Sequence, residues 1–252
     1  MTTRFLQGAV LAALLGAGSA QAQIATETLS YQAQGLDFEG YVARNAALDE
    51  SRGIVLIVHD WDGLNDYERT RAQMLAAEGY TAVALDLYGT AEDPQGMEDY
   101  RRLSGALNSD REAMRARLSA ALDAAGDLPG AGAGMVLMGY CFGGTAALEA
   151  ARMGAELDGF VIFHGNLALP EGQDYAAIAA PVMVYHGSAD PTSGMGDLAA
   201  LLDGLREAEV AHGAQVYGNV RHAFTVWGGR DYDAAADAAS WAGMLAFLDE
   251  TL

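Results

Sequence analysis

Short, continuous apolar runs alternate along this chain with segments in which apolar residues recur at helical spacing. A continuous apolar run of about four to eight residues is typical of a strand that is buried on both faces, as in a parallel sheet. Strands that alternate with helices predict an α/β fold, in which a mostly parallel sheet carries helices on both faces. The predicted strands cover 53–59, 81–87, 135–138, 159–164, 181–185 and 214–217, and the predicted helices cover 66–78, 109–122, a segment that opens at 145, 196–208 and 234–248.

Two local signals add detail to this pattern. Residues 26–32 and 36–43 alternate between apolar and polar positions around Ala33-Gln34-Gly35, so we predict an N-terminal antiparallel hairpin. Ser109 and Glu112 have the spacing of a capping box, so we predict that they begin the helix that follows.

The stretch from Met135 to Leu148 contains the strongest chemical signal. A predicted strand leads into Gly139-Tyr-Cys-Phe-Gly-Gly144, and small residues then open a helix. A sharp turn from strand to helix strains the residue at the bend and exposes its side chain, and flanking glycines relieve the clash. This is the nucleophile elbow of an α/β-hydrolase fold, with Cys141, the only cysteine of the chain, at the bend. The alternative is that Cys141 is a buried small apolar side chain.

A catalytic thiol needs a base, and the base needs a group that orients it. In this fold the acid and then the histidine follow the nucleophile along the chain. Asp190 closes one predicted strand and His222 follows the last one, so we predict a triad of Cys141, Asp190 and His222. Each partner also has a simpler interpretation, Asp190 as a turn residue before a proline and His222 as a surface histidine. Of the other histidines, we expect a structural role for His186, a loop position for His212 and a place lining the site for His164.

Acyl transfer also requires hydrogen-bond donors for the oxyanion that develops on the substrate. The backbone N–H of Phe142, directly after the nucleophile, is one predicted donor, and the N–H of Trp61, in the loop after an early strand, is the second. The helix that starts at this point should also lower the pKa of the Cys141 thiol.

The same early loop carries several groups that could ligate a metal. His59, Asp60 and Asp62 lie close together in sequence, but the ligand spacing of a zinc site is missing, so we predict no metal and no cofactor. We expect instead that Asp60 approaches the sulfur and influences its ionisation.

The N-terminus and the charge place limits on location and partners. Residues 1–22 combine one arginine, a short apolar core and Ala20-Gln21-Ala22, so we predict a signal peptide, a single domain over 23–252, and a periplasmic or secreted protein. The chain has no lysine and a formal net charge of −20. A surface this acidic repels phosphate backbones and anionic lipid, so we predict no nucleic-acid partner and, after removal of the signal, no membrane partner. We expect a monomer that acts on a small molecule.

The motifs together resemble the dienelactone hydrolase family, in family order and over nearly the whole predicted mature chain. The resemblance implies hydrolysis of a lactone or related ester through a thioester on Cys141. His222 would act as base and then acid, Asp190 would orient it, and Asp60 would occupy the place of a carboxylate that keeps the thiol in a resting state. The matching segments are 59–66, 78–80, 86–89, 139–144, 186–190 and 222–224.

Two departures from the family pattern bear on the substrate. The loop carboxylate is usually glutamate, one methylene longer than Asp60. An arginine that binds a substrate carboxylate four residues after the histidine is replaced by Val226, and Arg101 or Arg102 is the candidate for a second such arginine. The alternatives are therefore a catalytically weak binding or stress protein with the same fold, or a serine esterase that uses Ser188 or Ser193.

Overall fold

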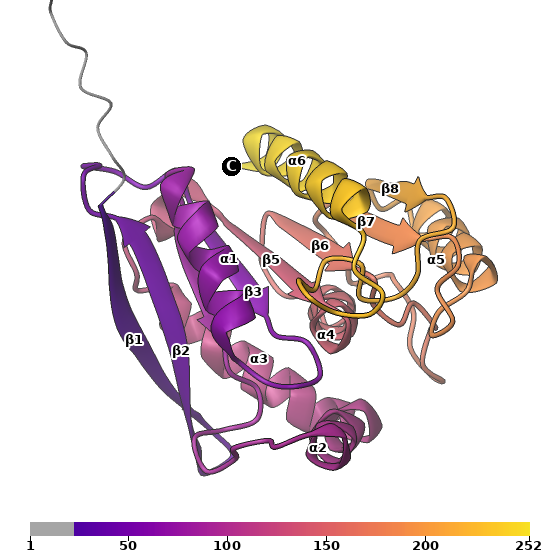
Figure 1. Ribbon diagram of the computed structural model, residues 1–252, viewed down its shortest axis with the longest axis horizontal. Coiled ribbons are helices and arrows are strands. Elements are labelled where there is room, and N and C mark those ends of the chain that lie inside the picture. Colours follow the sequence, from indigo (N-terminus) through magenta and orange to yellow (C-terminus); the bar gives the residue numbers. More distant parts are fainter. Residues whose placement is uncertain (1–22) are drawn as a thin grey trace, which may run out of the picture.

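The computed structural model describes residues 23–252, and the predicted signal peptide lies outside the described residues (Figure 1). Eight strands form one sheet. They are β1 (Ile24–Ala33), β2 (Leu36–Asn45), β3 (Ile54–Val58), β4 (Thr81–Leu85), β5 (Met135–Tyr140), β6 (Gly159–Phe163), β7 (Val182–Gly187) and β8 (His212–Tyr217).

The sheet confirms the mostly parallel arrangement and the hairpin. Its strand order is β1-β2-β4-β3-β5-β6-β7-β8. β1 and β2 pair antiparallel, β2 also pairs antiparallel with β4, and the strands from β4 to β8 in this order are parallel. The chain changes direction across the sheet between β3 and β5, whose residues Val58 and Gly139 are paired. Loops that leave such a point open a crevice at the carboxyl ends of the strands, where α/β proteins bind ligands.

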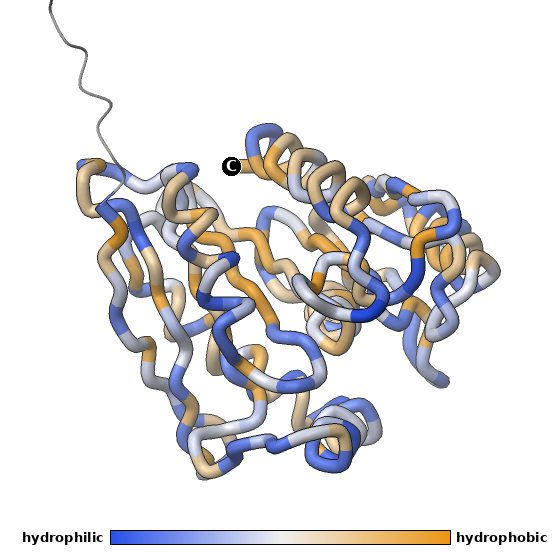
Figure 2. Tube along the Cα trace, in the orientation of Figure 1, coloured by the Kyte–Doolittle hydropathy of each residue, from blue (hydrophilic) through white to orange (hydrophobic). Residues whose placement is uncertain are grey.

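Helices cover both faces of the sheet, as Figure 1 shows. α1 and α6 pack on one face, while α3, α4 and α5 pack on the other, with α2 against α3. The apolar segments of the chain gather in the central strands, between these two layers (Figure 2). The helices are α1 (Asp66–Ala77), α2 (Met97–Ser109), α3 (Arg111–Ala125), α4 (Phe142–Arg152), α5 (Met195–Glu207) and α6 (Ala234–Thr251), with a short 3-10 turn, η1 (Ala131–Ala133).

The capping box predicted for Ser109 and Glu112 is wrong. Ser109 is the last residue of α2, a helix that was not predicted from the sequence. Asp110 caps α3 instead, because its side chain accepts a hydrogen bond from the N–H of Ala113 at 2.9 Å. Asp110, one position after Ser109, therefore provides the side-chain acceptor at the start of α3, as an N-cap aspartate commonly does.

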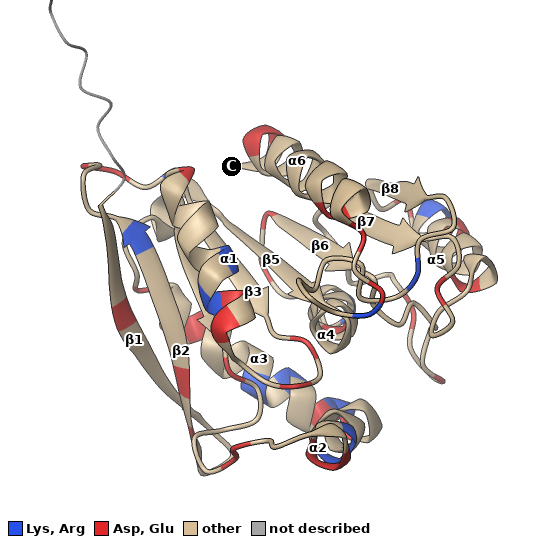
Figure 3. Cartoon of the chain, viewed as in Figure 1, with Lys and Arg blue, Asp and Glu red and all other residues tan. Residues whose placement is uncertain are grey.

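Acidic side chains are distributed over helices, strands and loops of the described chain (Figure 3). Within residues 23–252, no helix is both long enough and apolar enough to cross a bilayer.

Candidate active site

Cys141 lies at the bend between β5 and α4, in the conformation that the elbow pattern predicts. Its φ of 53° and ψ of −109° are strained for a residue with a side chain. Its N–H donates to the carbonyl of Phe163 at 3.0 Å, which fixes the bend to the neighbouring strand β6. A Cβ on Gly139 would lie 2.1 Å from the carbonyl oxygen of Gly143, and one on Gly143 would lie 2.2 Å from that of Val58. Only glycine permits this close approach of β3, β5 and α4.

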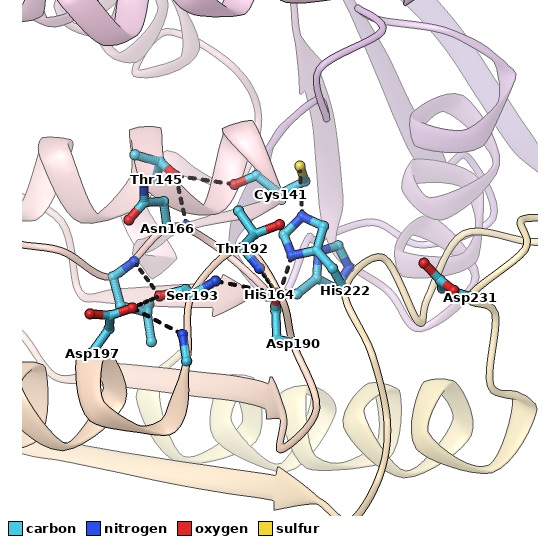
Figure 4. Close-up of polar contacts among 12 residues, drawn as sticks. Cys141, Thr145, His164, Asn166, Asp190, Thr192, Ser193, Asp197, His222 and Asp231 are labelled. Atoms are coloured by element: carbon cyan, nitrogen blue, oxygen red, sulfur yellow. Dashed lines mark hydrogen bonds and ion pairs between the residues drawn. The ribbon is translucent and has the colours of Figure 1, made fainter.

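The structure brings the three predicted triad residues together. The Nε2 of His222 lies 3.0 Å from the Sγ of Cys141, and its Nδ1 lies 2.7 Å from the Oδ2 of Asp190 (Figure 4). The other oxygen of Asp190 accepts from the N–H groups of Thr192 at 2.7 Å and Ser193 at 3.3 Å. Asp190 is therefore more than a turn residue, because its carboxylate is fixed on one side by backbone and on the other by the imidazole.

The charge state of Asp190 assigns the His222 tautomer. Burial alone would raise the pKa of Asp190, but hydrogen bonds from His222 and the backbone lower it below its ordinary value. The ionised carboxylate accepts the Nδ1–H of His222, which leaves Nε2 with a lone pair that faces the thiol. The pair is arranged for transfer of a proton from sulfur to nitrogen.

The expected low pKa of the Cys141 thiol is wrong for this resting arrangement. Burial and the nearby carboxylate of Asp60 raise the thiol pKa well above its ordinary value. The backbone N–H of Phe142 at the start of α4 acts in the opposite direction but does not outweigh them. The resting sulfur therefore holds its proton, and the Nε2 of His222, 3.0 Å away, is the nitrogen in reach of it.

Asp60 lies in the buried loop after β3, as expected for a group that influences the sulfur. Its Oδ1 accepts from the N–H of Asp62 at 3.2 Å, and its own N–H donates to the Oε1 of Glu68 at 3.3 Å. Burial, Asp62 and Glu68 raise the pKa of Asp60 well above its ordinary value. A negative charge on Asp60 in turn disfavours ionisation of the Cys141 thiol.

Glu68 is a site residue that the sequence analysis missed. It is fully buried, accepts from the N–H of Asn65 at 3.1 Å and caps α1, and burial raises its pKa to about 7. The signal was present, because Asn65 and Glu68 have the spacing of a capping box. This box fixes both the start of α1 and the loop that carries Asp60.

His59 supports the same loop and is not free to bind a metal. Its Nε2 accepts from the N–H of Leu87 at 3.1 Å, so its Nδ1 carries the hydrogen that is donated to the carbonyl of Asp60 at 2.6 Å. Its ring also stacks on Phe142, with 5.7 Å between centroids. In the described part of the chain, no three histidine, cysteine, aspartate or glutamate side chains are grouped to hold a metal ion.

Trp61 and Phe142, the two predicted oxyanion donors, follow the ends of neighbouring strands, Trp61 in a loop and Phe142 as the first residue of α4. Trp61 follows β3 and Phe142 follows β5. The carbonyl of Trp61 accepts from the hydroxyl of Tyr88 at 2.9 Å, and among residues 23–252 its N–H donates to no protein acceptor. The role of both N–H groups stays a prediction.

The arginines proposed to bind substrate and the serines proposed as alternative nucleophiles have no hydrogen bond or ion pair to Cys141 or His222 in the described chain. Arg101 and Arg102 are exposed on α2, and Arg102 pairs with Glu92 at 2.8 Å. The Ser193 hydroxyl is buried between the N–H of Leu167 and Asp197. The hydroxyl of Ser188 accepts from the N–H of Asn219 at 2.8 Å.

A cavity of about 570 Å³ borders the loop that follows Trp61. Tyr88 separates it from the elbow, since this ring lines the cavity and packs 5.6 Å from the ring of Phe142. The charged side chains of the lining are mainly acidic, with Arg69 as the one basic side chain. The acidic lining residues are Glu39, Asp62, Asp86, Glu92 and Asp93.

Replacing Asp60 with asparagine should speed alkylation of Cys141 by iodoacetamide several-fold at about pH 8. The change removes a negative charge that raises the pKa of the thiol, so more thiolate forms at a given pH and the half-point of the alkylation profile moves to lower pH. Mass spectrometry of the alkylated protein over a pH series measures this shift. An unchanged profile would mean that Asp60 does not act on the sulfur.

The sheet order and the nucleophile elbow after β5 define an α/β-hydrolase. A model of the dienelactone hydrolase family matches residues 38–252, and the chain belongs to this family. It is 27% identical over 228 residues to a Salmonella typhimurium protein named for carboxymethylenebutenolidase activity, covering 86% of this chain and 84% of that one. It is 30% identical over 146 residues to the carboxymethylenebutenolidase of Pseudomonas putida, covering 54% of this chain and 60% of that one.

A solved structure supports the same conclusion. A dienelactone hydrolase-like promiscuous phosphotriesterase from metagenomic libraries superposes with a TM-score of 0.84 and 31% identity, covering 90% of this chain and 98% of that one. The protein is therefore a hydrolase of the ester and lactone class.

Proposed function

We propose that this protein is an exported cysteine hydrolase that cleaves small esters or lactones through a thioester on Cys141. The observation that carries the proposal is the position of the His222 ring, 3.0 Å from the sulfur and 2.7 Å from Asp190. The apolar segment before Gln23 supports export from the cytoplasm. Recovery of the protein from a periplasmic fraction with Gln23 as its first residue would test export, and an intact Met1 there would contradict it.

The reaction follows from these positions. His222 takes the thiol proton at Nε2 while the sulfur attacks the substrate carbonyl carbon. The N–H groups of Phe142 and Trp61 would stabilise the oxyanion that forms. The C–O bond then breaks, and the departing oxygen receives the proton from His222, which leaves an acyl group on Cys141. A water molecule, deprotonated by His222, attacks the thioester and releases the acid, and the sulfur regains its proton.

The charged groups around the site bear on the charge of the substrate. Five residues that line the cavity beside Tyr88 are acidic and one is basic, and Val226 occupies the position of the family's arginine. Neither Cys141 nor His222 lines this cavity, but a negatively charged substrate that approaches the site would be repelled by its acidic side chains and would lack an arginine to bind its carboxylate. We therefore propose uncharged esters or lactones as substrates, in place of a dienelactone carboxylate.

Incubation of the mature protein with 4-nitrophenyl acetate should add one acetyl group to Cys141, and the group should then be lost over minutes. Acid quenching and peptide mass spectrometry detect the thioester and its decay. The His222→Ala variant is the control, because without the base it should acylate slowly and retain the acetyl group. A protein that is never acylated would support the alternative of a binding or stress protein, and acetylation of Ser188 or Ser193 would support a serine esterase.

A further inference from the structure

Thr225 lies three residues after His222 and is fully buried, although its loop connects β8 to α6 near the surface. Its backbone carbonyl accepts from the Nη2 of Arg71 at 3.1 Å and lies 3.2 Å from the hydroxyl oxygen of Tyr67. Its Oγ1 lies 2.9 Å from the Tyr67 hydroxyl and 2.8 Å from the Nε2 of His164. One threonine therefore joins α1, the end of β6 and the loop that carries His222.

The other end of this network is a buried ion pair. Arg71 pairs with Asp237 of α6, and its side chain is only 2% exposed. Its guanidinium lies over the rings of Trp227 at 4.2 Å and Trp241 at 5.0 Å. A desolvated arginine held by a carboxylate and aromatic faces is a rigid anchor, since a change of rotamer would leave both charges unpaired.

Hydrogen-bond directions can be assigned outward from this anchor. The Nε of Arg71 donates to the oxygen of Tyr67 at 3.2 Å, so the Tyr67 hydroxyl hydrogen is free to be donated to the nearer acceptor, the Oγ1 of Thr225 at 2.9 Å. The Thr225 hydroxyl hydrogen can then be donated to the Nε2 of His164. Arg71, Tyr67 and Thr225 thus each donate one hydrogen bond to the next residue of the series, which ends at His164.

His164 depends on this last contact. Its ring is fully buried, and within the described chain its Nδ1 has no hydrogen-bond partner, so the Thr225 hydroxyl is the polar group that fixes its orientation. The ring packs edge-on against His222, with 5.1 Å between centroids and 66° between planes. Burial, together with positive charge on His222, lowers the pKa of His164 well below its ordinary value. His164 can therefore stay uncharged while its neighbour carries the thiol proton.

We propose that Thr225 and His164 are positioning residues, through which the Arg71–Asp237 pair holds the His222 ring on the line between Asp190 and the Cys141 sulfur. This inference rests on the proposed function, because it treats His222 as the base. His164 forms the wall behind the imidazole, and Thr225 fixes that wall while also anchoring the loop by its carbonyl. Of its members, only His164 was placed at the site from the sequence, because the network is dispersed over more than 160 positions of the chain.

Thr225→Val, which removes the hydroxyl and keeps the shape, tests the proposal. We expect iodoacetamide alkylation of Cys141 at neutral pH and kcat for 4-nitrophenyl acetate each to fall about tenfold, with KM changed less than about twofold, because a displaced base affects proton transfer more than binding. Thr225→Ser should restore both rates to within about twofold of wild type. Alkylation needs no turnover, so it reports on the position of His222 even if the protein is never acylated.

Thr81→Val is the matched control. Thr81 is also buried and donates one hydrogen bond, to the carbonyl of Pro129 at 2.8 Å, but it lies at the amino end of β4, away from the elbow. It should lower thermal stability about as much as Thr225→Val and leave alkylation unchanged. Equal rate losses in Thr225→Val and Thr225→Ser, or no loss in Thr225→Val, would overturn the proposal. Should Thr225→Val fail to fold, Tyr67→Phe decides, with an expected loss of about threefold in alkylation and no loss as the contrary result.

Discussion

Replacement of Cys141 with alanine is expected to lower kcat/KM for 4-nitrophenyl acetate by about 10³-fold or more. The change removes the atom that attacks the carbonyl carbon, and loss of a nucleophile in a triad typically removes most of the rate enhancement. Residual hydrolysis would come from the oxyanion donors and from water activated by His222. Initial rates measured over a range of substrate concentrations give the ratio.

Ser188→Ala is the control for this experiment. Ser188 lies on the loop after β7 and accepts a hydrogen bond from the N–H of Asn219, without contact to the sulfur. Its replacement should leave kcat/KM within about twofold of wild type. Equal activity in the Cys141→Ala variant and the wild type would remove the thioester mechanism altogether.

Replacement of Gly143 with alanine is expected to lower the free energy of unfolding by on the order of 3 kcal/mol or more. A Cβ at this position would lie 2.2 Å from the carbonyl oxygen of Val58 and 2.6 Å from that of His59. Both contacts are with backbone of β3 and the loop after it, which cannot move without separating β3 from β5. Urea denaturation followed by circular dichroism measures the change.

Gly105→Ala provides the comparison for this variant. Gly105 lies inside α2, where a Cβ would meet no atom within 4 Å. Alanine should therefore raise the free energy of unfolding by about 0.5–1 kcal/mol, because it favours the helix over the unfolded chain. If both glycine variants had the same stability, the packing of the elbow against β3 would be looser than the structure indicates.

Much of the site could be predicted because its residues follow apolar strands that can be recognised along the sequence. Cys141, Asp190 and His222 each come after a predicted strand of a parallel sheet, and the carboxyl ends of such strands share one edge. The glycines around Cys141 identified the bend without any knowledge of the neighbouring strand. Local sequence was sufficient here because the elbow is a local structure.

Other features depended on contacts that sequence cannot show. The effect of Asp60 on the thiol was expected from the sequence, but the burial of the sulfur was not, and the two together outweigh the local effect of α4 that was expected to lower the thiol pKa. The α3 cap was misassigned because Ser109 and Asp110 both suit an N-cap, and the choice depended on α2 ending at Ser109. The network through Thr225 is likewise formed only by tertiary packing.

The presence of a single sulfhydryl group has a practical consequence for any preparation of this enzyme. Since Cys141 is the only cysteine, a chromogenic disulfide reagent reports on one position per chain. Under the proposed thioester mechanism, the fraction of chains that react equals the fraction able to turn over substrate, so specific activities can be corrected for oxidised protein without a separate active-site count. In an oxidising compartment, the fraction of chains whose Cys141 has been oxidised would then equal the fraction of activity that has been lost.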